Sequence, residues 1–76
     1  MRRPRMKTLA QLEKQCHIWN RACPIGTEVQ YHPVIGRPEY RLRKTKTGAY
    51  VLSGHTAVIW LEGESGCVAL DAVEFA

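Results

Sequence analysis

The segment W-L-E-G-E-S-G-C-V-A-L, residues 60–70, has the residue types of a serine nucleophile. Glu62 and Glu64 lie on either side of Gly63, and Ser65 follows Glu64, in a near match to the G-x-S-x-G elbow of hydrolases. That motif needs glycine on both sides of the serine and a following helix. Here Cys67 takes the place of the second glycine, and V-A-L, typical of a strand, follows it. The pattern therefore predicts a glycine turn in a hairpin and no catalytic residue.

Six cysteine and histidine side chains have the chemistry of metal ligands: Cys16, His17, Cys23, His32, His55 and Cys67. No C-x-x-C or H-x-x-x-H pair occurs among them, although structural zinc usually uses such close pairs. A hairpin could bring Cys67 to His55 as a thiol–imidazole pair, but a buried cysteine and a histidine at a strand start account for the same residues. We expect no metal and no cofactor, and whether these six side chains bind a metal stays open.

Basic residues gather in the middle of the chain. Residues 37–46 hold a tyrosine among five cations: Arg37, Tyr40, Arg41, Arg43, Lys44 and Lys46. Residues 1–7, expected to be a flexible arm, add Arg2, Arg3, Arg5 and Lys7. A basic strand with aromatic side chains suits single-stranded nucleic acid, but it is equally typical of a solvated edge strand. His55, at a turn before a strand, is expected to be structural and is the further polar candidate for a binding site.

Charge is distributed unevenly along the 76 residues, whose net charge is +4. Residues 1–46 hold all 11 Lys and Arg residues with three of the seven acids, a net +8, and residues 47–76 hold the other four acids, a net −4. The two halves are expected either to neutralise each other or to form a two-faced surface. No apolar run is long enough for a membrane span or a secretory signal, and an odd number of cysteines favours a reducing, cytoplasmic setting.

Periodicity predicts one helix followed by strands. Thr8 to Gln11 forms a capping-box pattern, and apolar residues then recur at spacings of three and four as far as Cys23, which precedes a proline. This predicts an amphipathic helix over residues 8–22. Alternating or β-rich segments predict strands at 27–32, at 40–52 with a bend at Gly48, at 56–61, at 68–70 and at 73–75.

These elements predict an α+β domain over residues 8–76, with the helix packed on a five-stranded, SH3-like small antiparallel β-barrel over residues 25–76. The expected core is apolar or aromatic throughout: Leu9, Leu12, Trp19, Val29, Tyr31, Leu42, Val51, Val58, Trp60, Val68, Leu70 and Val73. Ile59 and Leu61 alternate with Val58 and Trp60, so their burial would require that the helix or a second copy covers that face.

Three segments also carry a resemblance to known proteins: P-I-G-T-E-V-Q-Y (24–31), K-T-K-T-G-A-Y-V-L-S-G-H-T-A-V-I-W-L-E-G (44–63) and G-C-V-A-L-D-A-V (66–73). Together they resemble a group of small, uncharacterised proteins of bacteriophages and mobile elements of proteobacteria. The resemblance implies a mobile-element origin and a cytoplasmic setting, without an activity or site residues.

The function expected from the sequence is that of a non-enzymatic accessory protein that binds a host or phage protein, including a protein of a host defence system. Nucleic acid, held by residues 37–46 and the N-terminal arm, is the alternative target. No membrane partner is expected, and the chain is expected to be a monomer or a homodimer.

Overall fold

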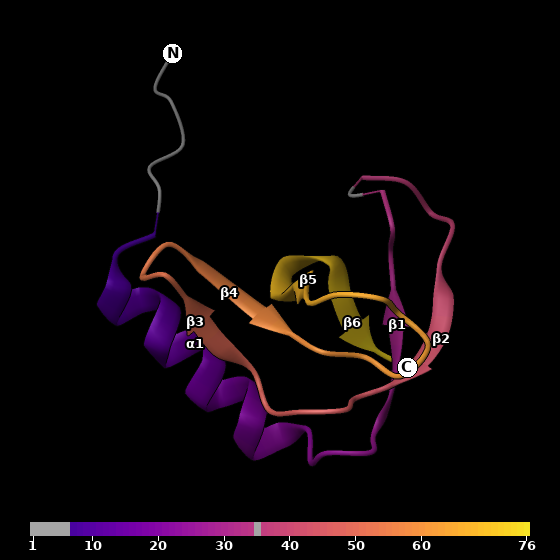
Figure 1. The fold of residues 1–76 in the computed structure, drawn as a ribbon, viewed down its shortest axis with the longest axis horizontal. Helices are drawn as coiled ribbons and strands as arrows, with labels where there is room; N and C mark the ends of the chain where they lie inside the picture. The colour runs from indigo at the N-terminus through magenta and orange to yellow at the C-terminus, as the bar shows by residue number, and fades with distance from the viewer. Residues whose placement is uncertain (1–6, 35) are drawn as a thin grey trace.

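The computed structural model describes residues 7–34 and 36–76. Its elements, in chain order, are α1 (Leu9–Ala22), β1 (Glu28–Tyr31), β2 (Arg41–Lys44), β3 (Tyr50–Leu52), β4 (Thr56–Ile59), β5 (Val68–Ala69), the 3-10 turn η1 (Leu70–Ala72) and β6 (Val73–Phe75). The strands form two antiparallel sheets, ordered β2-β1-β6 and β3-β4-β5 (Figure 1). The predicted α+β class is confirmed.

The predicted helix is also confirmed, together with the cap that starts it. The Thr8 hydroxyl accepts a hydrogen bond from the Gln11 N–H at 3.2 Å, and the Gln11 side chain accepts one from the Thr8 N–H at 2.8 Å. The helix ends at Ala22 because Pro24 disfavours helical backbone at Cys23. Leu12, Cys16, Trp19 and Cys23 are buried, as their spacing predicted.

The long strand predicted over residues 40–52 is instead two strands in different sheets. Between them, the side-chain amide of Asn20 binds both backbone groups of Ala49, accepting from its N–H at 2.7 Å and donating to its carbonyl at 3.0 Å. These groups are therefore unable to pair with a neighbouring strand. Gly48 lies so close to Asn20 that an added Cβ would be 3.2 Å from the Asn20 Oδ1. The helix therefore breaks the strand at the predicted bend.

The expected five-stranded barrel is not confirmed. Six strands are present in the described residues, and their two sheets do not close into a barrel. In the described part of the chain, one isolated β-bridge, between Thr45 and Leu61, joins the backbones of the two sheets. Thr45 is 1% exposed. Its hydroxyl accepts hydrogen bonds from the backbone N–H groups of Gly26 and Thr27 and donates one to the Pro24 carbonyl. These bonds connect the start of β1 to the end of β2.

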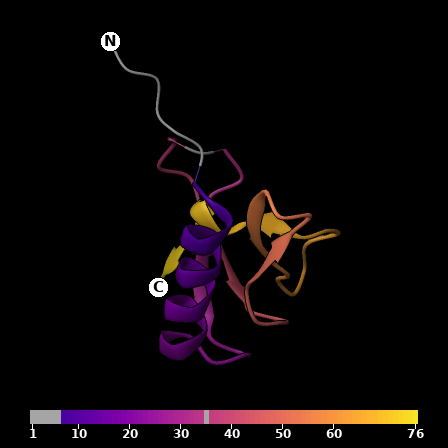
Figure 2. The same ribbon diagram turned by 90° about the vertical axis from the view of Figure 1, so that its left-hand side faces the viewer.

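The core lies between α1 and the two sheets, and β4 is buried along Ala57, Val58 and Ile59. Figure 2 shows α1 between the C-terminal strand on one side and the β3–β4 hairpin on the other. Because α1 packs against β3 and β4, Ile59 and Leu61 are as deeply buried as Val58. The helix, and not a second copy of the chain, therefore covers the face that carries Ile59 and Leu61.

Three members of the expected core lie outside it. Trp60 is only partly buried, and its indole N–H donates to the Tyr50 hydroxyl at 2.7 Å. Leu9 is 51% exposed at the first position of α1, and Leu42 is 49% exposed on β2. Leu42 lies opposite Gln30, whereas Arg43 lies opposite the fully buried Val29, so the strand presents its arginines to the core side of the sheet.

Candidate functional site

The basic segment predicted to bind a partner is divided by the fold. Arg41 and Arg43, from β2, both contact the carboxylate of Glu64, with Nη1–Oε2 and Nε–Oε2 distances of 3.3 and 3.0 Å. Glu64 comes from the turn between Leu61 and β5, and its side chain is only 13% exposed. The acidic half of the chain therefore neutralises two of the five central cations within the fold.

The remaining predicted residues do not gather into one site. Arg37, Lys44 and Lys46 are exposed and form no ion pair within the part of the chain that the structure describes. Tyr40 is 50% exposed, with its ring centroid 5.9 Å from that of His32. The exposed His55 lies in the β3–β4 turn, where its backbone N–H donates to the Leu52 carbonyl. Arg2, Arg3 and Arg5 lie outside the described residues.

The segment 62–66 is the turn that its glycines predicted. Gly63 has a φ of 88°, which favours glycine, and β5 follows. The β4–β5 register aligns Val58 with Ala69 and therefore Trp60 with Cys67, at the end of β4 far from His55. The hypothetical Cys67–His55 pair is therefore not formed.

The buried thiols have the character of core residues. Cys16, Cys23 and Cys67 are all free, and Cys67 is the most accessible of the three. Burial raises the pKa of the Cys16 thiol, and the negative charge of Glu13 raises it further. Over residues 7–34 and 36–76, no three His, Cys, Asp or Glu side chains gather as metal ligands, and no helix is both long and apolar enough to cross a membrane.

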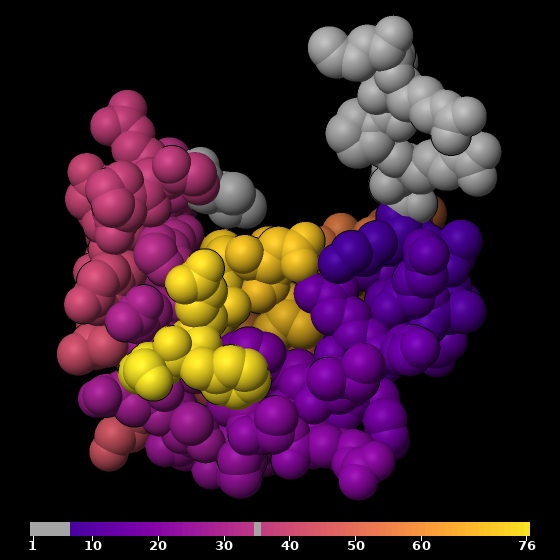
Figure 3. Space-filling view, turned by 180° about the vertical axis from the view of Figure 1, so that it is seen from behind, coloured from indigo at the N-terminus to yellow at the C-terminus, as the bar shows by residue number. Residues whose placement is uncertain are grey.

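A hollow lies between α1 and the η1–β6 segment; we call it the α1–β6 groove. Its volume is about 860 Å³. Figure 3 shows it as a depression between the C-terminal segment in yellow and α1 in indigo and purple. Apolar side chains line one part, namely Ile18, Trp19, Ala22, Leu70, Val73 and Phe75. Polar side chains line the other, namely Lys7, Thr8, Gln11, Lys14, Gln15 and Asp71.

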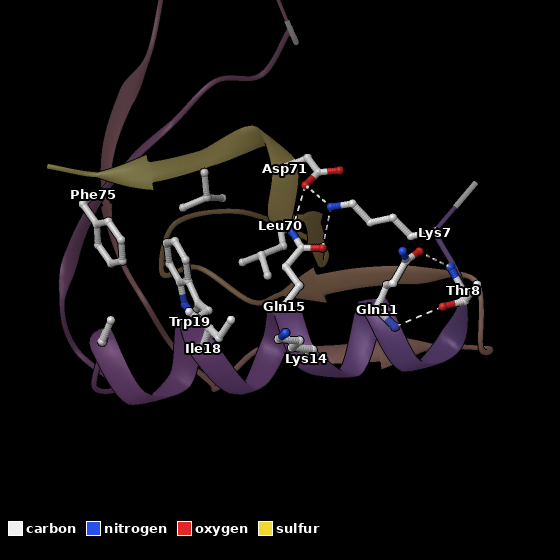
Figure 4. Close-up of a pocket in the computed structure, with 12 residues that line it drawn as sticks. Lys7, Thr8, Gln11, Lys14, Gln15, Ile18, Trp19, Leu70, Asp71 and Phe75 are labelled. Carbon is white, nitrogen blue, oxygen red and sulfur yellow. Dashed lines mark hydrogen bonds and ion pairs between the residues drawn. The ribbon is translucent and has the colours of Figure 1, made fainter. Parts of the chain in front are cut away.

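An aromatic stack forms the apolar end of the groove. The rings of Trp19 and Phe75 lie 4.8 Å apart, with 10° between their planes (Figure 4). Trp19 is 8% exposed, whereas Phe75 and Ile18 are 54% and 57% exposed. A buried indole thus stacks against the half-exposed Phe75 ring, and the exposed Ile18 lines the same end of the groove.

A hydrogen-bonded triad closes the polar end. Lys7 Nζ donates to Gln15 Oε1 at 2.8 Å, Gln15 Nε2 donates to Asp71 Oδ1 at 2.8 Å, and Lys7 Nζ lies 3.5 Å from Asp71 Oδ1 (Figure 4). These contacts join α1 to η1. Lys7 was predicted to belong to a flexible arm, but its side chain is bound in this triad. Lys14 lines the same end and forms no ion pair with the described residues.

Comparison with protein-family models, with curated proteins and with solved structures found no match to this chain. The candidate site therefore stands on the geometry of the groove.

The sequence interpretation missed Ile18 and Phe75, which define the groove. A signal for Ile18 was present, because it is a large apolar residue of the helix outside the Leu12–Cys16–Trp19–Cys23 stripe. Phe75 had a weaker signal, as the end of an alternating V-E-F strand. Neither pattern indicates that the helix and the last strand lie side by side.

Proposed function

We propose that this protein is a non-enzymatic binding module that engages another protein through the α1–β6 groove. The observation that supports this most directly is the exposure of two large apolar side chains in the groove, Ile18 and Phe75, of which Phe75 stacks on the buried ring of Trp19. Protein interfaces are enriched in aromatic residues at their centres and surround them with a polar rim. The groove has both parts, with Lys14 and the Lys7–Gln15–Asp71 triad as the rim.

The charges of the molecule favour a protein over nucleic acid as the partner. Nucleic-acid binding requires Lys and Arg side chains that are free to neutralise phosphates, which releases the counterions condensed on the nucleic acid. Arg41 and Arg43 already bind Glu64, and Lys7 already contacts Asp71. A partner phosphate would have to compete with these carboxylates, whereas an apolar protein segment gains from covering Phe75 and Ile18.

Nucleic acid remains the second candidate, supported by the exposed Arg37, Lys44, Lys46 and Tyr40 around β2. Titration with short single- and double-stranded DNA and RNA at about 50 and 200 mM salt tests it, because phosphate contacts produce a steep salt dependence. Binding that falls steeply with salt and is weakened by Lys44→Ala and Lys46→Ala would favour this candidate over the groove.

We also propose that the fold is SH3-like. The orders β2-β1-β6 and β3-β4-β5, with a 3-10 turn before the last strand, support an SH3-like arrangement that is split into two sheets. We further propose that the module is a cytoplasmic accessory protein of a phage or mobile element. The resemblance of residues 24–31, 44–63 and 66–73 supports this origin.

Photo-crosslinking in a proteobacterial host tests the proposed function. A benzoylphenylalanine residue is placed at Ile18 in the groove or at Leu42, which is similarly exposed outside it. The proposal predicts an adduct of one defined mass at position 18 that resists nuclease and is reduced by Phe75→Ala. Adducts only at position 42, adducts removed by nuclease, or none at position 18 would contradict it.

A further inference from the structure

One edge of the strand β6 has no partner strand among the residues that the structure describes. This strand is the last strand of the sheet β2-β1-β6, and among the described strands only β1 pairs with it. The backbone N–H of His32 donates to the Ala72 carbonyl. Because hydrogen-bonded and non-hydrogen-bonded pairs alternate in an antiparallel ladder, the backbone N–H and C=O of Glu74 point towards β1, and those of Val73 and Phe75 point away from it. The Val73 N–H donates to the Leu70 carbonyl. The Val73 C=O and the Phe75 N–H and C=O therefore remain for a further strand.

This edge borders the α1–β6 groove. Figure 3 shows the yellow C-terminal segment with the earlier strands on one side and the hollow, followed by α1, on the other. A strand added to β6 would therefore lie in the groove beside α1, about 4.8 Å from β6. The groove then supplies what a bare edge lacks, namely an apolar surface for alternate side chains of the added strand.

The side chains along the groove define the chemistry of such a strand. Its residues nearest the Trp19–Phe75 stack would be covered by Ile18 and Phe75, which requires apolar side chains. Towards the N-terminal end of α1, Lys14 forms no ion pair within the described residues, and the neighbouring Asp71 is held by Lys7 and Gln15. The Lys14 ammonium is therefore complementary to a carboxylate on the added strand.

We infer that the partner contributes an extended peptide segment, apolar at alternate positions and acidic at one end, which pairs with β6 as a fourth strand of the sheet β2-β1-β6. This inference rests on the proposed function and adds to it the conformation and charge of the bound segment. Antiparallel and parallel pairing both satisfy the free groups of Val73 and Phe75.

The test begins with random 12-residue peptides displayed on phage and selected on the wild-type protein, with counter-selection on the Phe75→Ala variant. The inference predicts selected sequences with apolar residues at spacing two and an Asp or Glu towards one end. A representative peptide is synthesised and its amides are N-methylated one at a time. Methylation of the amide that pairs with β6 should weaken binding about tenfold or more, because it removes a buried hydrogen bond and blocks the edge.

A charge exchange provides the second measurement. Lys14→Glu should weaken binding of the peptide about three- to tenfold, whereas Lys44→Glu, which changes an exposed lysine outside the groove, should leave binding unchanged. Selected peptides with helical spacing, or peptides indifferent to N-methylation, would overturn the inference while leaving the proposed function intact. A failure to select any peptide that discriminates against Phe75→Ala, together with no crosslink at position 18, would overturn both. Dimerisation through β6, detected by ultracentrifugation and lost in Phe75→Ala, would replace the peptide with a second copy.

Discussion

Trp19 of α1 and Phe75 of β6 stack with their ring centroids 4.8 Å apart and their planes 10° from parallel. One ring is buried and the other is half exposed, so the pair belongs to the core on one side and to the surface on the other. Such a pair has two separable contributions, one to stability and one to recognition.

Phe75→Ala is expected to cost about 1 kcal/mol of unfolding free energy, because it removes an aromatic pair whose outer ring is half exposed. Urea denaturation measures this cost. The variant should remain folded and lose binding of a selected peptide, whereas Tyr40→Ala, which removes a similarly exposed ring outside the groove, should retain it. Equal effects of the two variants on binding would contradict the assignment of the groove.

Glu64→Gln is expected to destabilise the protein by about 1–2 kcal/mol, because the Arg41 and Arg43 guanidiniums lose their shared, mostly buried carboxylate. The matched control is Glu62→Gln in the same turn, where the side chain is exposed and the change should stay within about 0.5 kcal/mol. Affinity for single-stranded DNA at low salt should rise in Glu64→Gln, since two arginines become available. Indistinguishable unfolding curves for the two variants would argue against the ion-pair cluster.

The sequence predicted the elements better than their faces. The helix and its capping box were predictable because the signals are local, as were the turns at Gly54 and Gly63. The orientation of β2 was not predictable, because a one-residue change of register exchanges the two faces of a strand. Leu42 was expected in the core, but Arg43 lies on that side, and its partner Glu64 comes from a distant turn.

Thr45→Val is expected to cost about 1–3 kcal/mol, because the buried hydroxyl that binds Gly26, Thr27 and Pro24 is replaced by a methyl group. Thr56→Val, at an exposed position of β4, should be neutral or slightly stabilising. Chemical denaturation of both variants compares them directly. A neutral Thr45→Val would show that this hydroxyl does not hold β1 to β2.

The stability of the folded protein should fall as the pH rises above the ordinary thiol pKa of 9.0, in part because of Cys16. Burial, and then the charge of Glu13, raises the pKa of this thiol in the folded state. The unfolded chain therefore releases the proton first, and unfolding is favoured with increasing pH. Cys16→Ala should reduce the slope with which the unfolding free energy falls above about pH 9. Parallel curves for the wild type and the variant would contradict this role.

The groove was not predictable for a related reason. Its apolar end joins the helix to the last strand, and its polar end joins Lys7 and Gln15 to Asp71. Periodicity indicates which side of an element is apolar, but it does not indicate which elements pack together. The basic cluster, in contrast, is conspicuous in the sequence because its members are neighbours in the chain, and the fold engages part of it internally.

The most direct test of the groove uses the two indole N–H signals in a ¹⁵N–¹H NMR spectrum, with a selected peptide as the titrant. Trp19 lies beneath the groove, whereas Trp60 donates to Tyr50 outside it, so the second indole is an internal control. We expect the Trp19 signal and the amide of Phe75 to shift or broaden on titration while the Trp60 signal stays in place. A constant Trp19 signal, with the largest changes along Arg41–Lys44, would contradict the proposal that this groove binds the partner.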